Sequence, residues 1–391
     1  MSLDTARIDG LLEAAVEEGA LPGAVVVIAD RDGLVYEGAA GKLSEGGPAV
    51  TPDTMFRYAS CTKALASVAA LQLIERGRIG LDDDVASVRP EFAAIQVLEG
   101  FDGDQPILRA PSRQATIREL LTHTSGLAYF FTSGDLARYH EVTGVPHVLT
   151  GEAASLHVPM AEDPGTIWAY GTNTDWVGLV VEAASGLTLD AYLAEHVTGP
   201  LGMTDTTFQP SDEQRARMMA VHARTADGGF EPSPIELAPD PDWWSGGHGL
   251  CGTGRDYAHF IQMLLREGEF GGAHILESET VALAFSDQLR GVPMPQDGIV
   301  SAFPELANDV PALPFDEAWG LGFHLVLEDI PRMRRAGSGD WAGIFNLYYW
   351  IDRAAGVGGM LLTQVLPFFD MPVVETFQAI EADVYAQLVT A

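Results

Sequence analysis

The chain has 391 residues and carries 22 basic and 55 acidic side chains, for a formal net charge of −33. A surface this acidic repels phosphate backbones and anionic headgroups, so the charge argues against nucleic-acid binding and membrane-surface docking. Because 47% of the residues are hydrophobic and 20% are charged, the chain can bury a core of roughly two to three domain-sized units, or one large two-part fold. The composition predicts a globular protein and leaves small neutral or cationic molecules as ligands.

The sequence contains two cysteines, Cys61 and Cys251, which are too few for a disulfide framework and favour a reducing compartment. The first residues lack a basic start and a continuous apolar run, so no signal peptide is expected. The longest uncharged stretch, 354–369, is interrupted by Gly, Thr, Gln and Pro and falls short of the roughly 20 apolar residues of a spanning helix. We therefore expect a cytoplasmic protein without a membrane segment.

The N-terminal region predicts a helix followed by a β-hairpin. Residues 1–19 alternate Leu, Ala and Val with acids at helical spacing. Two β-branched runs then flank residues 30–33, where an Asp-Gly pair favours a tight turn. Residues 61–78 are rich in Ala and Leu, with neither Gly nor Pro before Gly77, which predicts a buried helix.

The middle of the chain predicts mostly helix. Between residues 81 and 240, segments such as 116–122 and 175–184 have helical character and alternate with Pro- and Gly-bearing connections. Few strands are expected there. A Pro- and Gly-dense loop at 239–254 precedes a further helix.

The C-terminal part predicts strands and a final helix. Its β-like segments, separated by turn signals at hairpin spacing, are 323–330, 342–356 and 357–369, and a helix is expected at 372–388. A lone hairpin is too small to be stable. Strands at both ends of the chain therefore imply one sheet that is completed by distant segments.

Lysine is the informative residue, because the chain has only Lys42 and Lys63. Ser60 and Lys63 are spaced i and i+3 in the first turn of the predicted helix, so the amine can reach the hydroxyl. Unpaired N–H groups at the helix start favour negative charge there. This arrangement predicts a serine nucleophile with a lysine base, provided that burial or nearby cations lower the pKa of Lys63. The alternative is that Ser60 caps the helix and Lys63 is solvated.

The run FRYASCTKALASVAALQLIERGRIGLDDDV is followed in order by TIRELLTHTSGLAY, YGTNTDWVGLVVEAASG, GPLGMTDTTF and GSGDWAGIFNLYYWID. Over nearly the whole chain this resembles the serine β-lactamase and penicillin-binding-protein superfamily, and within it the family VIII carboxylesterases. The resemblance implies a β-lactamase-like α/β (α+β) fold, with an antiparallel sheet flanked by helices and an inserted, mostly helical domain. We expect a sheet domain of residues 1–59 and 245–391, a helical domain of residues 60–244, and an active site in the crevice between them.

The resemblance implies three motifs, of which the first is Ser60 as nucleophile with Lys63 as base. The second is a tyrosine followed, after one residue, by Asn or Ser. Tyr170-Gly171-Thr172 matches its tyrosine, whereas Thr172 departs from the commonest Asn and leaves Asn173 as a partial substitute for an amide contact to the substrate. A phenol with a pKa of about 10 ionises near pH 7 only beside a cation, which Lys63 could supply. The two groups would titrate together, and which one is the base stays open, as does simple core packing of the tyrosine.

The third motif is usually Lys-Thr-Gly or a similar triplet on an edge strand, and this chain has Trp341-Ala342-Gly343. Gly343 permits a close backbone approach to a ligand. The backbone N–H groups of Ser60 and Ile344 are implied as the oxyanion hole. Because Trp341 replaces a cation that would hold the carboxylate of a β-lactam, we expect Trp341 and Gly343 to contact an uncharged ester.

Other motifs carry less information. Residues 247–252 match G-x-G-x-x-G but follow a Pro-rich loop instead of a strand, which argues against a dinucleotide site. No serine lies in G-x-S-x-G, and the histidines form no H-E-x-x-H. We therefore expect neither a metal nor a cofactor. Cys61 is turned by about 100° from Ser60 on a helix and is interpreted as a small buried residue.

These inferences predict a serine esterase that cleaves small to medium neutral carboxylic esters through an acyl-enzyme on Ser60, with Lys63 or Tyr170 as general base. No separate deacylating carboxylate is identified. Acyl transfer to an alcohol, β-lactamase or D,D-peptidase activity, and a catalytically silent binding protein are the alternatives. The expected partner is a small-molecule ester, and no oligomeric state is predicted.

Overall fold

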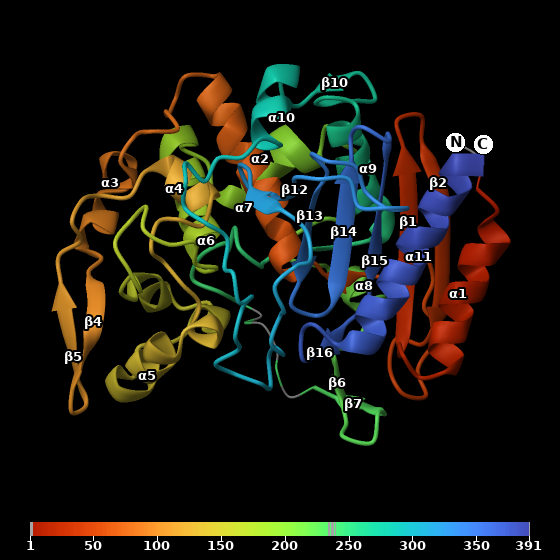
Figure 1. Cartoon of the computed structure of the whole chain (residues 1–391), viewed down its shortest axis with the longest axis horizontal. Coiled ribbons are helices and arrows are strands. Elements are labelled where there is room, and N and C mark those ends of the chain that lie inside the picture. The colour runs from red at the N-terminus through yellow and green to blue at the C-terminus, as the bar shows by residue number, and fades with distance from the viewer. Residues whose placement is uncertain (1–2, 234, 236–237, 239, 391) are drawn as a thin grey trace.

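The computed structural model describes residues 3–390 apart from 234, 236, 237 and 239, so the first residue of the predicted loop at 239–254 lies outside the described residues. Its centre is a large sheet (Figure 1), whose strands are β1 (Gly23–Asp30), β2 (Leu34–Gly41), β11 (Glu317–Trp319), β12 (His324–Val326), β13 (Gly339–Gly343), β14 (Leu347–Asp352) and β15 (Val357–Leu362). Their order is β11-β12-β13-β14-β15-β1-β2, and every neighbouring pair is antiparallel.

The two ends of the chain complete this sheet together. Strand β1 pairs with β15, so that Val25 lies opposite Leu362. Strands β1 and β2 form the predicted hairpin, and the Asp30 carboxylate accepts hydrogen bonds from the N–H groups of Asp32 at 2.8 Å and Gly33 at 3.0 Å. The predictions of a mixed α/β fold and of one sheet built from distant segments are confirmed.

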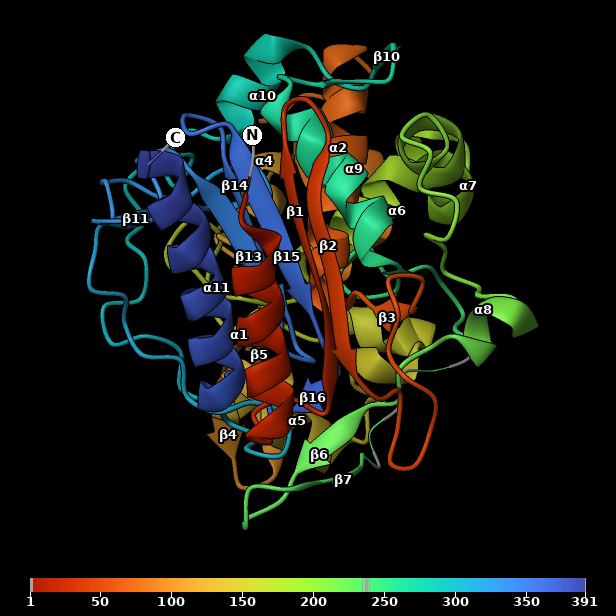
Figure 2. The ribbon, with the colours of Figure 1, turned by 90° about the vertical axis from the view of Figure 1, so that its right-hand side faces the viewer.

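Helices cover both faces of the sheet. Helices α1 (Thr5–Glu17) and α11 (Met371–Thr390) lie side by side on one face (Figure 2), and α9 (Gly254–Leu265) packs against β1 and β15 on the other. Within β1, Val26 and Ile28 belong to the core beneath α1 and α11, whereas Val25 and Val27 belong to the larger core that contains α9. Successive side chains of a strand point to opposite faces, so burial on both faces explains the uninterrupted apolar run of β1.

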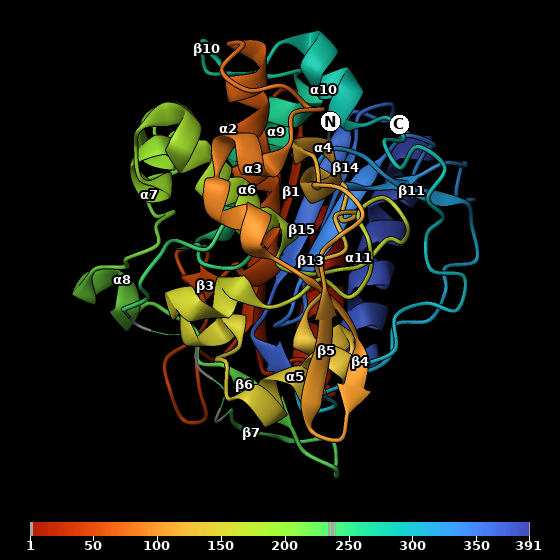
Figure 3. The ribbon, with the colours of Figure 1, turned by 90° about the vertical axis from the view of Figure 1, so that its left-hand side faces the viewer.

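Between β2 and α9 the regular structure is mainly helical (Figure 3). Its helices are α2 (Thr62–Glu75), α3 (Val85–Val88), α4 (Ile117–Leu121), α5 (Gly134–Thr143), α6 (Asn173–Ser185), α7 (Leu189–Leu193) and α8 (Asp212–Ala216), and α10 (Ser278–Ala284) follows α9. The buried helix expected at 61–78 corresponds to α2, which packs against α6. The division of the chain at residues 60 and 245 stays a prediction.

The expectation of few strands between residues 81 and 240 was wrong for two hairpins. One consists of β4 (Val97–Asp102) and β5 (Gln105–Arg109), the other of β6 (His222–Arg224) and β7 (Phe230–Pro232), and β16 (Val365–Leu366) pairs with β6. Shorter pairs join β3 (Phe56–Arg57) to β8 (Cys251–Gly252), and β9 (Glu269–Phe270) to β10 (Ala273–His274). Strand β5 has no buried residue, so it lacks the apolar alternation by which a strand is recognised.

Two expectations about the whole chain can be compared with the structure. Both cysteines are free and buried, which confirms the interpretation of Cys61 as a buried residue. Among the described residues, no single helix is long and apolar enough to cross a membrane, although the bent pair formed by α6 and residues 189–198 passes the length and composition criteria together.

A buried ion pair links α11 to the sheet. Arg334 is 8% exposed and Glu381 0% exposed, and the guanidinium donates to both carboxylate oxygens of Glu381, at 2.5 and 2.9 Å. Arg334 also bonds to Asp340 on β13. Because burying either charge is costly without its partner, this contact makes the docking of α11 depend on both residues.

The variant Glu381→Leu is expected to be destabilised by about 3–5 kcal/mol, because it leaves the Arg334 charge buried with one fewer partner. The double variant Arg334→Leu/Glu381→Leu should recover a large part of this loss, because it removes both charges. Thermal unfolding followed by circular dichroism measures both effects. A single variant that melts like the wild type would show that the ion pair does not hold the helix.

Candidate active site

Ser60 lies in a short 3₁₀ turn, Ala59–Cys61, directly before α2. The sequence analysis placed it in the first turn of the helix itself, but α2 begins two residues later, at Thr62. Ala59 has a φ of +47°, a conformation that residues with a β-carbon rarely adopt. Such strain persists only where the surroundings hold the backbone in place, so the turn that presents Ser60 depends on its neighbours.

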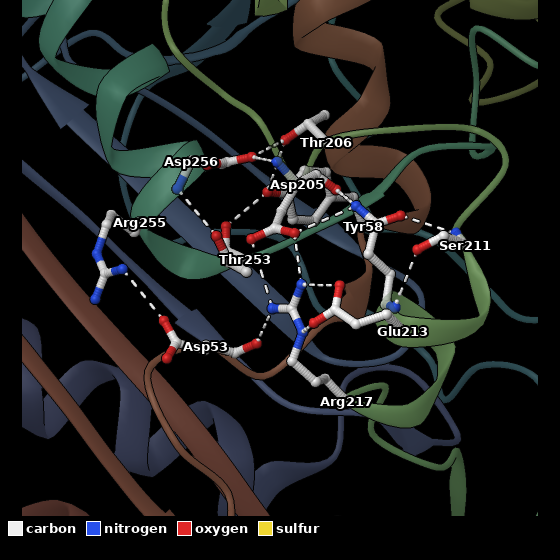
Figure 4. Close-up of polar contacts among 11 residues, drawn as sticks. Asp53, Tyr58, Asp205, Thr206, Ser211, Glu213, Arg217, Thr253, Arg255 and Asp256 are labelled. Carbon is white, nitrogen blue, oxygen red and sulfur yellow. Dashed lines mark hydrogen bonds and ion pairs between the residues drawn. The ribbon is translucent and has the colours of Figure 1, made fainter.

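Tyr58 anchors this turn (Figure 4). Its hydroxyl donates to the carbonyl of Thr253 at 2.6 Å and lies 3.5 Å from the hydroxyl of Thr206. Thr206 in turn donates to the buried carboxylate of Asp256 at 2.9 Å. Because Tyr58 is fully buried, this network holds the backbone two residues before Ser60.

Lys63 is buried beside the serine, with 2% of the residue exposed. Its Nζ lies 3.3 Å from Ser60 Oγ, 3.0 Å from the hydroxyl of Tyr129 and 2.8 Å from the carbonyl oxygen of Gly247. Burial lowers the pKa of Lys63 to about 8, against the opposite effect of the Asp175 charge. About a tenth of the amine is therefore neutral at pH 7. The alternative in which Ser60 caps the helix and Lys63 is solvated is wrong.

Tyr170 lies next to both groups. Its phenol interacts with the side chain of Ser60, and Lys63 Nζ lies 4.8 Å from the centroid of its ring. The indole N–H of Trp341 donates to the Tyr170 hydroxyl at 3.1 Å. Burial raises the pKa of Tyr170 above its usual range, although the interactions with Ser60 and Trp341 oppose this shift. The phenol is therefore protonated at neutral pH, and is not the anion that the sequence analysis considered.

Strand β13 packs against the turn Ala59–Cys61, which carries Ser60. A β-carbon at residue 343 would lie 2.6 Å from the carbonyl oxygen of Tyr58, so only a glycine allows this close approach. Gly343 therefore lets β13 approach the turn that carries Ser60, whereas its predicted contact with a ligand stays a prediction. Trp341 and Ile344, which flank Gly343, line the same cavity as Ser60.

The cavity beside Ser60 has a volume of about 440 Å³ and a largely apolar lining. One side is formed by the segment 294–315, and another by the free edge of β13. Among the described residues, β12 pairs only with Gly339 and Asp340 of β13. Trp341 and Ala342 therefore have no strand partner on that side and line the cavity instead.

The cations that line this cavity are already paired. His324 lies 2.8 Å from carboxylate oxygens of both Glu317 and Asp340. Although burial disfavours the charged imidazole, Asp340 and Glu317 raise the pKa of His324 to about 9. Arg334 is held by Glu381 and Asp340. Both cations are therefore paired with carboxylates, which add negative charge to the lining.

The amide of Asn173, which the sequence analysis left as a partial substitute for a substrate contact, is bonded within the protein. Asn173 is fully buried; its amide N–H groups donate to the carbonyls of Leu127 at 3.1 Å and Ala169 at 3.2 Å, and its oxygen accepts from Ser125 at 2.5 Å. The amide therefore supports a loop, and cannot substitute for Thr172 in binding a substrate. Thr172 is itself buried.

Sequence reasoning also missed polar residues that contact Lys63. Tyr129 and Gly247 accept its hydrogen bonds, and Asp175, which is 0% exposed, accepts from both of them. These residues lie in stretches that the sequence analysis had noted, namely THTSGLAY, YGTNTD and the glycine-rich residues 247–252. Their spacing along the chain did not predict a contact with Lys63. Among the described residues, no group of three or more His, Cys, Asp or Glu side chains could hold a metal ion.

The sequence matches the Beta-lactamase family over residues 8–382. It is similar to monacolin J acid methylbutanoyltransferase of Aspergillus terreus, with 33% identity over 95% of this chain and 94% of that protein. It is also similar to lovastatin esterase of Penicillium rubens, with 31% identity over 97% and 98% of the two chains. The solved structure of unliganded simvastatin synthase (LovD) from Aspergillus terreus superposes with a TM-score of 0.85 and 31% identity, over 98% of each chain. The predicted β-lactamase-like fold is confirmed.

The variant Lys63→Met tests the desolvation of the amine. Below about pH 8 the lysine is protonated in both the folded and the unfolded chain, so burial of its charge opposes folding in full. Between about pH 8 and 10.5 the folded protein loses this proton first, and the penalty disappears. At pH 7 the variant should therefore be more stable than the wild type. This advantage in the free energy of unfolding should shrink by about 3 kcal/mol between pH 7 and pH 10, and the unfolding midpoints of the two proteins measure it. Lys42→Met, at an exposed position, is the control; a Lys63→Met difference that does not change with pH would contradict the expectation.

Proposed function

Because this chain belongs to the Beta-lactamase family, we propose that it is a serine enzyme that forms an acyl-enzyme on Ser60 from small to medium neutral carboxylic esters. The observation that carries the proposal is the buried amine of Lys63, 3.3 Å from Ser60 Oγ. A hydroxyl beside an amine with a lowered pKa is the arrangement of an activated nucleophile. Ester hydrolysis is the first proposed outcome, and acyl transfer to an alcohol is the second.

In the acylation step, the neutral amine of Lys63 accepts the proton of Ser60 while the serine oxygen bonds to the ester carbonyl carbon. The negative charge that develops on the carbonyl oxygen would be stabilised by the backbone N–H groups of Ser60 and Ile344. The carbon–oxygen bond to the alcohol then breaks, and the leaving oxygen takes a proton from the ammonium, directly or through Tyr170. The products are a free alcohol and an acyl group on Ser60.

Tyr170 acts in this scheme as a protonated phenol, and Lys63 as the general base. The Trp341 N–H donates to the phenol oxygen, which leaves the Tyr170 proton for Ser60 or the leaving oxygen and stabilises transient negative charge on the phenol. For deacylation, water or an alcohol replaces the leaving group and the proton moves along the same path in reverse. The two outcomes therefore require the same side chains.

Charge supports an ester over a lactam substrate. Trp341 replaces the cation expected in front of a lactam carboxylate, and the cations near it, Arg334 and His324, are bonded to carboxylates. The net charge of −33 adds long-range repulsion of anions. A neutral ester has no carboxylate, so it does not need a free cation in the cavity and is not repelled by the negative net charge.

Acyl transfer is supported by the cavity and by the relatives. An apolar lining lets the apolar body of an alcohol compete with water for the site. One similar protein is named a methylbutanoyltransferase and another an esterase, so closely similar chains are named for both outcomes. The ratio of transfer to hydrolysis would then depend on the alcohol that is present.

The variant Ser60→Ala tests the nucleophile. Wild-type protein is expected to hydrolyse a short-chain nitrophenyl ester, and to form the corresponding alkyl ester when butanol is added. The variant should lose both activities by at least about a thousandfold, because both pass through the same acyl-enzyme. Cys61→Ala is the matched control and should remain active. Comparable turnover of a chromogenic cephalosporin by the wild type would favour a lactamase instead.

The variant Trp341→Lys tests the charge argument. It should raise turnover of a carboxylate-bearing lactam relative to a neutral ester, because a cation is restored where a carboxylate would lie. Trp341→Phe is the control, because it removes the hydrogen bond to Tyr170 without adding charge; it should slow both substrates about equally. Steady-state kcat/KM for the two substrates gives the ratio. An unchanged ratio in Trp341→Lys would refute the argument.

A further inference from the structure

We propose that Asp175 is a positioning residue for the base: it orients the two groups to which Lys63 donates, and so directs the lone pair of the neutral amine at Ser60. This inference rests on the proposed function. Asp175 lies in the first turn of α6, and its hydrogen bonds within the described part of the chain do not include one to Ser60. It acts through its neighbours.

Asp175 accepts three hydrogen bonds. They come from the hydroxyl of Ser245 at 2.5 Å, the backbone N–H of Gly247 at 3.0 Å and the hydroxyl of Tyr129 at 3.4 Å. Among the residues that the structure describes, the Gly247 carbonyl and Tyr129 are also the two groups other than Ser60 that receive hydrogen bonds from Lys63. One buried carboxylate therefore holds both of the other partners of the amine.

The direction of each hydrogen bond follows from the chemistry of its atoms. The carbonyl of Gly247 can only accept, so it takes one N–H of the amine. The hydroxyl proton of Tyr129 is donated to Asp175, so the phenol oxygen accepts the second N–H of Lys63. A neutral amine has two N–H groups and one lone pair, and the lone pair is left for the hydroxyl of Ser60. Without the carboxylate, Tyr129 could donate to the amine and compete with the serine.

The glycine-rich loop is shaped around this carboxylate. A β-carbon at residue 247 would lie 2.7 Å from both carboxylate oxygens of Asp175, and one at residue 246 would lie 2.5 Å from the carbonyl oxygen of Thr174. Only glycines allow the loop to close over the start of α6 and to bring the Gly247 carbonyl to Lys63. The stretch that matches a dinucleotide motif therefore serves the base.

Ser245 and His248 complete the support. The hydroxyl of Ser245 lies 2.7 Å from Nδ1 of His248. Burial lowers the pKa of His248 to about 4, so the imidazole is neutral at pH 7. The oxygen of Ser245 accepts from the backbone N–H groups of Gly247 at 3.1 Å and His248 at 2.9 Å. The hydroxyl proton of Ser245 is donated to a carboxylate oxygen of Asp175.

The titratable groups that face Lys63 come from its own helix start, from α6 and from the loops around them. Burial raises the pKa values of Cys61, Tyr129 and Tyr170 and lowers those of His123 and His248, so these five are uncharged at neutral pH. Asp175 is the carboxylate among them, and its charge raises the pKa of Lys63 against the effect of burial. Removal of this charge should lower that pKa further.

The variant Asp175→Asn tests the proposal, because it keeps the size of the side chain and removes the charge. We expect kcat to fall about 10- to 100-fold with KM nearly unchanged, and the acid limb of kcat/KM to move down by about one pH unit. The second readout is the pH dependence of the rate at which a nitrophenyl phosphonate labels Ser60, followed by mass spectrometry. Substitution of a residue with a purely structural role would shift neither the acid limb of kcat/KM nor the pH dependence of the labelling rate.

Asp352→Asn is the matched control. Asp352 is also fully buried and accepts hydrogen bonds from the hydroxyl of Tyr385 and the N–H groups of Arg335 and Ala355, but it lies on β14, away from Lys63. The Asp352→Asn variant should be less stable than the wild type, but the pH dependence of its kcat/KM and of its labelling rate should be unchanged. A second variant, Ser245→Ala, removes a support of Asp175 and leaves the charge. Ser245→Ala should lower kcat without shifting the pH dependence of kcat/KM or of the labelling rate. This variant tests the proposal if Asp175→Asn does not fold.

The outcomes separate this inference from the proposed function. Wild-type protein that neither hydrolyses esters nor becomes labelled at Ser60 would overturn the function. If the wild type is labelled and Asp175→Asn is labelled at the same rate with the same pH dependence, only the role of Asp175 is overturned. A loss of rate in Asp175→Asn with unshifted limbs would also overturn it, as would a Ser245→Ala variant with unchanged kcat.

Discussion

The proposed chemistry of this protein depends on the burial of one amine. Lys63 is removed from water next to a serine hydroxyl, and the cost of that burial is what makes its neutral form accessible near pH 7. The same burial requires that each N–H of the amine find an acceptor, since an unpaired polar group in this environment would be costly. The neighbouring phenol, carbonyl and carboxylate are arranged around that requirement.

The surrounding fold holds the serine where the amine can use it. The turn that carries Ser60 is strained at Ala59, and it is held between the anchored ring of Tyr58 and the backbone of β13. Strand β13 can come this close because residue 343 has no β-carbon. Its free edge then forms one wall of the cavity, so one strand both supports the nucleophile and shapes the space in front of it.

In the proposed function, electrostatics and apolar surface together favour a neutral ester. The cavity is apolar near Ser60, and its charged residues are arranged as a chain of ion pairs from Glu317 through His324, Asp340 and Arg334 to Glu381. Such a chain offers little to an anionic ligand. It also ties the cavity wall to α11, so substrate binding and the stability of this helix share residues. In the proposed reaction, whether water or an alcohol attacks the acyl-enzyme depends on which of them enters this apolar cavity.

The sequence by itself determined the elements whose signal is local. The hairpin of β1 and β2, the buried helix α2 and the Ser60–Lys63 spacing follow from turn residues and periodicity, because these patterns act between neighbours in the chain. Tyr170, Trp341 and Gly343 were reached through family resemblance. The partners of Lys63 were decided by the tertiary structure: Tyr129, Asp175 and Gly247 lie on separate segments, and no local pattern states which distant hydroxyl, carbonyl or carboxylate will satisfy a buried amine. The solvent-facing strand β5 was missed for a related reason, since pairing with β4 and not its own periodicity makes it a strand.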